Sequence, residues 1–239
     1  MPQTIKQSKK RRRRRLLKYL ALGGIIGPIL FSIVATIGVF LYPDYSLIST
    51  SISEMETKGA AHKALVDSIV IPWVSAAIPF AIALHKGIKN RGKLIEKVGP
   101  ISIILAAIVN LTLALFFPLD PEIVTGNTST PGTTMHITLV TISVPLTLLG
   151  PLALWRRLKH DKEWRGYDKY SLITFAAMLV MGIGNAFVIG GPYAGIVERL
   201  TLAIAMQWNL VMAVKLIRTL SNQAEENEEK QIPEVNNSV

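Results

Sequence analysis

Ser53, Asp120 and His136 are the residues of this 239-residue chain whose types could together perform nucleophilic catalysis. In a catalytic triad the histidine accepts the serine proton, the aspartate orients the imidazole ring, and the serine oxygen attacks a carbonyl carbon. All three lie beside long apolar stretches, so the substrate expected for such a site is a lipid ester or amide. Ser53 lacks the Gly-x-Ser-x-Gly context of many hydrolase nucleophiles, so the prediction depends on residue types alone.

The same residues also have structural interpretations. Ser53, with Glu56 three positions later, has the spacing of a capping box, in which the two side chains satisfy backbone N–H groups at the start of a helix. His136 stands at the beginning of an apolar stretch and could form a hydrogen bond there without any catalytic role. The capping interpretation requires no ligand and is the simpler of the two for Ser53.

A second group of polar and charged residues occurs in the same parts of the sequence. We expect it to bind a lipid headgroup or a small solute, and it consists of Tyr45, Glu54, Asp67, Glu198 and Arg199. Adjacent residues on a helix point about 100° apart, so Glu198 and Arg199 must each find a partner elsewhere. For Arg199 we expect either a buried ion pair with Asp120 or Glu54, or contact with an anionic headgroup.

The histidines and the lack of cysteine in the sequence argue against a metal site. Zinc is held by three or four close ligands, which are usually cysteine, histidine and carboxylate side chains. Only His62 and His136 belong to the segments that carry the candidate site, because His85 and His160 fall in the basic connections described below. The sequence therefore predicts no metal ion and no other cofactor.

Six long apolar stretches position the candidate residues. They are Tyr19–Tyr42, Ser68–Leu84, Gly99–Phe117, Ile137–Trp155, Ser171–Gly191 and Leu200–Val214, with flanking residues needed to lengthen the second and the last. A bilayer core of about 30 Å requires roughly 20 apolar residues in a helix. The stretches lack the alternation of barrel strands, and in lipid a helix pairs its backbone groups within one segment. The sequence thus predicts an all-α, polytopic membrane protein, a bundle of six transmembrane helices.

The basic residues indicate how these helices are oriented. Of the 26 Lys and Arg residues, 23 fall before the first stretch, after the last, or in the second and fourth connections. The positive-inside rule therefore predicts that both termini are cytoplasmic and that Ser53, Asp120 and Glu198 lie toward the opposite side. We expect a multi-pass protein of the cell membrane in contact with membrane lipids. Orientation and attraction to anionic lipid explain the net charge of +10, so no nucleic-acid partner is expected.

One membrane domain between two tails is the organisation that the composition predicts. Residues 1–15 are polar and basic, and residues 220–239 are rich in Asn, Gln and Glu, so both are expected to be disordered cytoplasmic tails. Residues 16–219 are expected to form the six-helix transmembrane domain. The sequence indicates no particular oligomeric state.

Short motifs resemble those of a known family. They are Tyr45-Ser46 and Ile52-Ser53-Glu54 after the first stretch, Phe117-Pro118-Leu119-Asp120 after the third, and His136 at the start of the fourth. Together with the six-span layout, they resemble domain-of-unknown-function family 998, a family of integral membrane proteins. The resemblance implies the six-helix fold and the importance of Ser53, Glu54, Asp120 and His136, and it implies no substrate.

Three functional classes are consistent with these observations. The first is a membrane protein that binds a lipid headgroup or small solute in a polar pocket on the extracytoplasmic side. The second is a membrane-embedded lipid hydrolase or transferase that uses Ser53, Asp120 and His136. The third is a small transporter, which the sequence favours least because the apolar stretches carry almost no ionisable group and show no inverted repeat.

Overall fold

Helices account for the regular structure in the computed structural model, which describes residues 3–88, 94–127, 129–159 and 161–229. Six helical segments are long and apolar enough to cross a membrane: Ser8–Leu41, Lys63–Gly87, Lys97–Phe116, Pro131–Leu158, Tyr167–Ala186 and Ala194–Ala224. Each of them overlaps one apolar stretch of the sequence. The predicted all-α bundle of six transmembrane helices is therefore confirmed in the described part of the chain.

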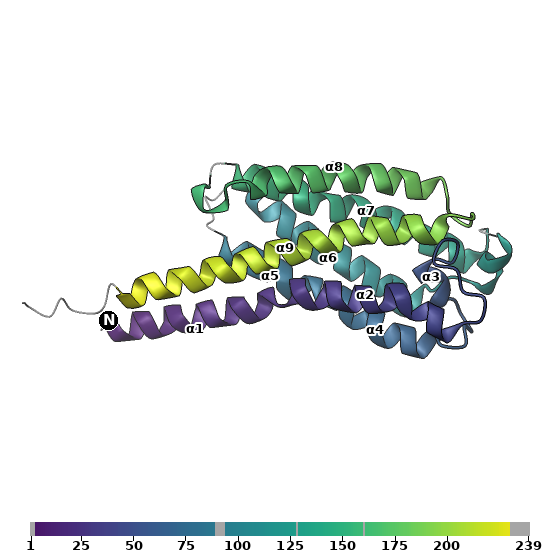
Figure 1. The fold of residues 1–239 in the computed structure, drawn as a ribbon, viewed down its shortest axis with the longest axis horizontal. Coiled ribbons are helices and arrows are strands. Elements are labelled where there is room, and N and C mark those ends of the chain that lie inside the picture. Colours follow the sequence, from purple (N-terminus) through teal and green to yellow (C-terminus); the bar gives the residue numbers. More distant parts are fainter. Residues whose placement is uncertain (1–2, 89–93, 128, 160, 230–239) are drawn as a thin grey trace, which may run out of the picture.

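Two of the six spans are each built from two helices (Figure 1). The first span contains α1 (Gln3–Ala21) and α2 (Gly23–Leu41), and the second contains α4 (Lys63–Ser75) and α5 (Ala77–Gly87). The other spans are α6 (Ile95–Phe116), α7 (Pro131–Leu158), α8 (Tyr167–Ala186) and α9 (Ala194–Glu229). Three short helices lie in connections: α3 (Ile52–Met55), η1 (Pro121–Thr125) and η2 (Lys162–Trp164).

The breaks in the first two spans lie against each other, and the break in the second has a local cause. Pro79 has no N–H to donate to the carbonyl group of Ser75, so the second span divides at Ala76. Gly23, at the start of α2, packs directly on the backbone carbonyl of Ala76, where a Cβ atom would collide. The small residue at position 23 therefore lets the first two spans approach closely, as expected for small residues between membrane helices.

The six spans pack in sequence order, and the last returns to the first. Helix α2 contacts α4, α5 contacts α6, α6 contacts α7, α7 contacts α8, α8 contacts α9, and α9 contacts α2. Helix α1 and the final part of α9 run side by side at one end of the bundle, here called the terminal end (Figure 1). The opposite end, here called the distal end, carries the connections formed by residues 42–62, 117–130 and 187–193.

The segments expected to be disordered tails are helical where the structure describes them. Helix α1 begins at Gln3 and includes the basic run Lys9–Arg15, and α9 continues to Glu229. Lysine and arginine are good helix formers, and the two helices are anchored to the bundle core by Leu17 and Leu220. Residues 1–2 and 230–239 lie outside the described residues.

Two clusters of buried side chains hold the bundle together. Near the terminal end, one cluster joins several spans through residues that include Leu17, Phe80, Leu154, Trp208 and Leu216. In the distal half, a second cluster includes Phe31, Met55, Val66, Trp73 and Ala114. The second cluster fixes the connection that carries α3 against α2, α4 and α6, and so holds the candidate residues 53–56 in place.

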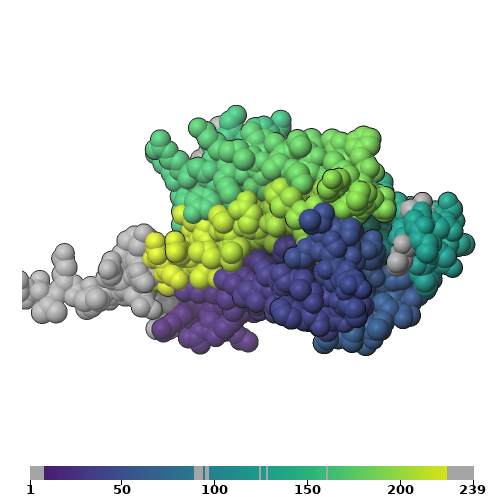
Figure 2. All heavy atoms as spheres, turned by 45° about the vertical axis from the view of Figure 1, so that its right-hand side comes forward, coloured from purple at the N-terminus to yellow at the C-terminus, as the bar shows by residue number. Residues whose placement is uncertain are grey.

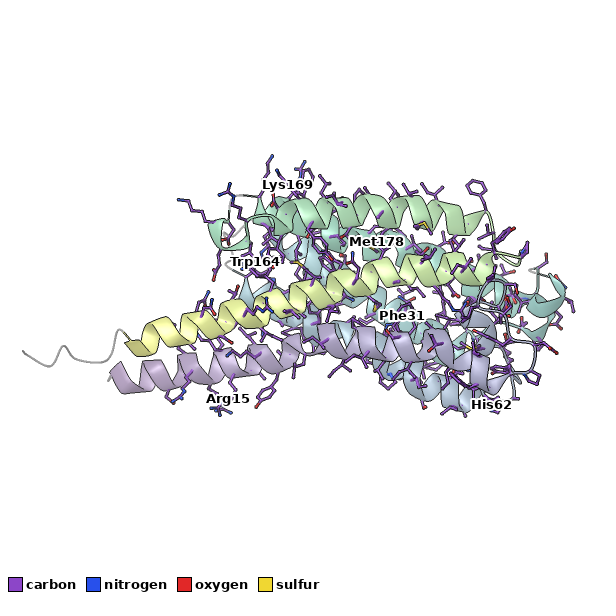
Figure 3. The ribbon with its side chains drawn as sticks, in the orientation of Figure 1. Arg15, Phe31, His62, Trp164, Lys169 and Met178 are labelled. Atoms are coloured by element: carbon purple, nitrogen blue, oxygen red, sulfur yellow. The ribbon has the colours of Figure 1, made fainter. Side chains whose placement is uncertain are left out.

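Basic residues that the sequence analysis assigned to the cytoplasmic side lie toward the terminal end. Figure 3 shows Arg15 and Lys169 toward that end and His62 at the distal end. Most of the described basic residues thus belong to segments at the terminal end, and Lys58, Lys63 and Arg199 are at the distal end. Which side of the membrane each end faces stays a prediction.

Candidate functional site

A cavity of about 260 Å³ lies inside the ring of spans. Its walls are mostly apolar, with contributions from α2, α4, α6, α7, α8 and α9. Trp208 and Ile103 belong both to the lining and to the core cluster near the terminal end. That cluster therefore closes the cavity toward the terminal end. The volume is slightly smaller than the roughly 300–1,000 Å³ of typical small-molecule pockets, and it fits a small molecule or part of a lipid.

Polar residues are concentrated in the distal part of the lining. Ser53, Glu56, His136 and Glu198 come from the connection around α3 and from the distal parts of α7 and α9. Deeper in the bundle, the lining includes Asn110 and Asn209, together with hydroxyl groups of Ser and Thr residues, and Asn185 lies near the distal end of α8. Polar groups at such depth are expected to face a protein interior or a cavity. The cavity is therefore amphipathic, with its ionisable groups at the distal end.

Ser53 and Glu198 are joined directly. The Ser53 hydroxyl donates a hydrogen bond of 2.9 Å to Glu198 Oε1, and the Ile52 backbone N–H donates one of 2.5 Å to Glu198 Oε2. Glu198 thereby satisfies a backbone donor in the first turn of α3 that no intrahelical carbonyl can reach. A carboxylate on the last span thus fixes the position of the short helix that carries Ser53.

The capping box predicted for Ser53 and Glu56 is formed two residues earlier. Ser51 is the N-cap of α3: its hydroxyl accepts from the Glu54 backbone N–H at 3.1 Å, and the Glu54 side chain accepts from the Ser51 N–H at 3.3 Å. The prediction for Ser53 was wrong because Ser51 and Ser53 both have a glutamate three positions later. Glu54 is occupied by this local role and does not belong to the cavity lining.

Of the two alternatives expected for Arg199 from the sequence, the ion pair with Asp120 or Glu54 is not formed in the described structure. Its guanidinium group is buried, and its hydrogen bonds go to neutral groups of α2, of the connection after it, and of α9. The acceptors are the carbonyl oxygens of Ala35 (2.9 Å), Leu47 (3.2 Å), Thr50 (2.7 Å) and Gly195 (3.0 Å), and the hydroxyl of Tyr45. The arrangement ties the first distal connection to the last span.

Tyr45 is held in the same network and does not line the cavity. Its hydroxyl accepts from Arg199 Nη2, and its ring packs so closely over Gly38 that a Cβ atom there would collide with the ring carbons. Burial of the phenol raises the pKa of Tyr45 above its ordinary value, although the nearby Arg199 charge acts in the opposite direction. The contacts of Tyr45 are structural ones, between α2, the first connection and α9.

Asp120 binds neither Ser53 nor His136. It accepts a hydrogen bond of 2.6 Å from Lys58 Nζ and one of 3.1 Å from the Thr133 backbone N–H. The hydrogen bond from Lys58 is the main reason that the pKa of Asp120 falls to about 2. Asp120 therefore joins the second distal connection to the first and to the start of α7, as a fixed carboxylate outside the cavity lining.

His136 is buried, and it lines the cavity. Its Nδ1 lies 2.8 Å from the carbonyl oxygen of Phe117. A carbonyl oxygen can only accept, so Nδ1 carries the proton, and in the neutral ring Nε2 is left with an acceptor lone pair. No hydrogen bond to Nε2 is made by any residue that the structure describes. His136 therefore offers an acceptor, rather than the serine-activating contact of an assembled triad.

Glu56 is a cavity-lining residue that the sequence analysis considered only as a capping partner. It is 6% exposed, and its Oε1 has no hydrogen-bond partner among the described residues. Burial, and then repulsion from Asp67, raise the pKa of Glu56 to about 8. Asp67 itself does not line the cavity, because it is paired with Lys63 at 2.6 Å. The Glu56 signal in the sequence was weak, since a glutamate in a polar connection is normally solvated.

The structure thus brings together part of the predicted site. Of the residues proposed from the sequence, Ser53, His136 and Glu198 line one cavity, with Glu56 added by the structure. Tyr45, Glu54, Asp67, Asp120 and Arg199 lie outside the lining and have local partners. Within the described residues, no group of three or more His, Asp or Glu side chains is placed to hold a metal ion.

Residues 25–215 match the family described as Protein of unknown function (DUF998). The match covers most of the chain, from α2 to α9. It includes the three ionisable residues of the cavity lining, Glu56, His136 and Glu198. No curated protein and no solved structure matches the chain. The chain therefore belongs to the DUF998 family and is a multi-pass membrane protein with six candidate spans.

Proposed function

We propose that this family member binds an amphiphilic small molecule or lipid in the cavity between its spans, with the polar headgroup at the distal end. The proposal depends on how the lining is divided: its ionisable residues Glu56, His136 and Glu198 lie distally with Ser53, and the remaining walls are mostly apolar helix surface. A headgroup requires polar partners in a water-poor site, and a hydrocarbon chain requires the apolar surface.

We further propose that the distal end faces the outside of the cytoplasm in the cell membrane. The concentration of 23 of the 26 basic residues in the tails and in the second and fourth connections supports this orientation. Both described ends of the chain lie at the terminal end, which is consistent with an even number of crossings (Figure 1). The ligand would then enter from the outer leaflet or the external solution.

A pair of glycines on α8 provides the test. Gly182 lines the cavity, and a Cβ atom there would have only Val144 as a near contact, at 3.8 Å, so Gly182→Leu fills cavity space without a backbone collision. Gly184 lies on the same helix outside the lining, with open space around it, and Gly184→Leu is the matched control. Lipids and small molecules that copurify with the protein are identified by mass spectrometry.

The expected result is a bound amphiphile that copurifies with the wild type and with Gly184→Leu, and is reduced on the order of tenfold in Gly182→Leu. Equal recovery from the two variants, with both folded, would show that the cavity is not the binding site.

A membrane-embedded hydrolase is the second candidate, and one observation favours it. The Ser53 hydroxyl is hydrogen-bonded to a carboxylate, Glu198, in a cavity that also contains His136. In this arrangement Glu198 would accept the proton of the Ser53 hydroxyl as general base. Asp120 would have no role in the reaction and would only stabilise the distal connections. Release of fatty acid from supplied lipid that is lost in Ser53→Ala, while binding persists, would support this activity.

A further inference from the structure

The ionisable lining of the cavity is acidic. The described lining residues that titrate are Glu56, His136 and Glu198, and none is lysine or arginine. An anionic headgroup, such as a phosphate or carboxylate, would therefore meet two carboxyl groups and no cation in the lining. Burial of like charges together without a counter-charge is unfavourable.

Three basic side chains of the distal end have other partners. Lys63 binds Asp67, Lys58 binds Asp120, and the buried Arg199 guanidinium donates to backbone carbonyls and to Tyr45. None of these three residues belongs to the cavity lining. The positively charged side chains at the distal end thus stabilise the distal connections.

The distal lining offers hydrogen-bond acceptors. Glu56 Oε1 is buried without a partner in the described residues, although a buried carboxyl oxygen normally has one. Glu198 accepts one hydrogen bond at each oxygen, and a carboxylate has about four acceptor sites. In neutral His136 the proton on Nδ1 leaves Nε2 as an acceptor. What is missing at this end of the cavity is a donor with several N–H groups.

We infer that the headgroup bound here is a primary ammonium group, which is attracted by the carboxyl groups of Glu56 and Glu198 and donates to acceptors of the distal lining. This inference rests on the proposed function and specifies its ligand class. A primary ammonium has three N–H donors and no acceptor, so it supplies donors to a lining that offers acceptors, and its positive charge is favourable beside the carboxyl groups. The same chemistry is present in an amine-bearing lipid and in a short soluble amine, which the experiment separates.

The protonation of Glu56 gives the inference a pH signature. The charged groups that act on this carboxyl are Asp67 and Lys63 from α4 and Glu198 from α9. With its pKa raised to about 8, mainly by burial, Glu56 is protonated at neutral pH when the cavity is empty. Ammonium binding favours the carboxylate, so the Glu56 proton is released to bulk water. The affinity for the amine is therefore expected to rise between about pH 6.5 and about pH 9, where an alkylamine is still charged.

The test uses two of the four tryptophans as reporters, because Trp73 and Trp208 line the cavity. A Trp155→Phe protein, which keeps Trp164 outside the lining as background, is titrated in nonionic detergent with a bromoalkylamine, whose bromine quenches nearby indole fluorescence. A bromoalkanoate of the same chain length is titrated in parallel. We expect the amine to quench at concentrations about tenfold lower than the alkanoate. The amine should quench less in the Gly182→Leu background, and its affinity should rise with pH.

Two substitutions and one competitor complete the design. Glu56→Gln and Glu198→Gln should each weaken amine binding by about tenfold, and Glu56→Gln should remove the rise with pH. Glu122→Gln, which removes an exposed distal carboxylate outside the lining, is the matched control. Ethanolamine that displaces the bromoalkylamine indicates a soluble amine as ligand, whereas failure to displace it indicates that the hydrocarbon chain is required.

The outcomes separate the inference from the proposed function. If the alkanoate binds as well as the amine and Gly182→Leu blocks both, the cavity binds amphiphiles and the ammonium inference is overturned. An affinity for the amine that is unchanged in both Glu56→Gln and Glu198→Gln would overturn it as well. If neither probe responds to Gly182→Leu, the proposed function itself fails.

Discussion

The Ser53 hydroxyl donates a hydrogen bond of 2.9 Å to the Glu198 carboxylate, across 145 residues of sequence. The neighbouring backbone N–H of Ile52 donates to the other oxygen of the same carboxylate. The last span therefore positions the first distal connection, and both residues line the cavity. In Figure 2 the first connection, in dark blue, lies against light green residues near the beginning of α9, where the Ile196 backbone N–H donates to the Ile48 carbonyl.

Ser53→Ala should lower the stability of the folded protein by about 1–3 kcal/mol, because a hydrogen bond to a charged group is lost and one Glu198 oxygen is left without its side-chain donor. The measurement is the thermal unfolding midpoint in detergent. Ser49→Ala is the control, since Ser49 lies in the same connection and the substitution leaves intact the hydrogen bond that its backbone N–H donates to the Ser46 hydroxyl. Equal midpoints for the two variants would show that the Ser53–Glu198 hydrogen bond does not contribute to stability as predicted.

Arg199→Lys should be strongly destabilising, by about 3–5 kcal/mol, although the charge is conserved. An ammonium group has three donors on a flexible stem and cannot reproduce the fork that reaches the carbonyls of Ala35 and Thr50 together with the Tyr45 hydroxyl. Folded yield and the thermal midpoint are the measurements. Arg218→Lys, at an exposed position of the same helix, should change neither.

The fold could be predicted from the sequence because one physical requirement largely determines it. Each span must be apolar and about 20 residues long, and that requirement is visible without knowledge of any contact. The spans of the structure accordingly overlap the predicted stretches, although helices α1 and α9 extend further than the composition of the tails suggested.

The site was less accessible because its contacts join residues far apart in sequence. Ser51 and Ser53 have the same local capping pattern, and in the structure Ser51 is the cap whereas Ser53 donates to the distant Glu198. Arg199 was expected to bind a carboxylate, but backbone carbonyls of the first connection surround it, and carbonyl positions are not encoded in residue type. Glu56 was missed because its burial follows from the packing of α3 against α2 and α9.

The stability of the protein should fall as the pH rises through the Glu56 titration. Burial raises the pKa of this carboxyl from 4.5 to about 8, so the folded state binds a proton more tightly than the unfolded state. The stabilisation from this proton is complete below about pH 4.5 and is lost as the pH rises through about 8, on the order of a few kcal/mol in total. Thermal midpoints measured across this range provide the test.

In Glu56→Gln this part of the pH dependence should be absent, so the variant should become more stable than the wild type at high pH. The exposed-site variant Glu122→Gln should retain the wild-type profile. Parallel profiles for wild type and Glu56→Gln would show that Glu56 is ionised in the folded protein at neutral pH, and the proton release expected on ammonium binding would then not occur.

Single cysteines introduced at the two ends of the bundle should report its orientation, because the natural sequence contains no cysteine. Glu122, in the distal connection, and Lys162, in the connection between α7 and α8 at the terminal end, are both exposed. With a membrane-impermeant maleimide applied to intact cells, Glu122→Cys should be labelled and Lys162→Cys should be labelled only after the membrane is opened. The expectation follows from the basic residues of the terminal-end connections, which are retained on the cytoplasmic side during insertion. Labelling of Lys162→Cys in intact cells, with Glu122→Cys protected, would place the acidic cavity mouth toward the cytoplasm and reverse the proposed route of ligand entry.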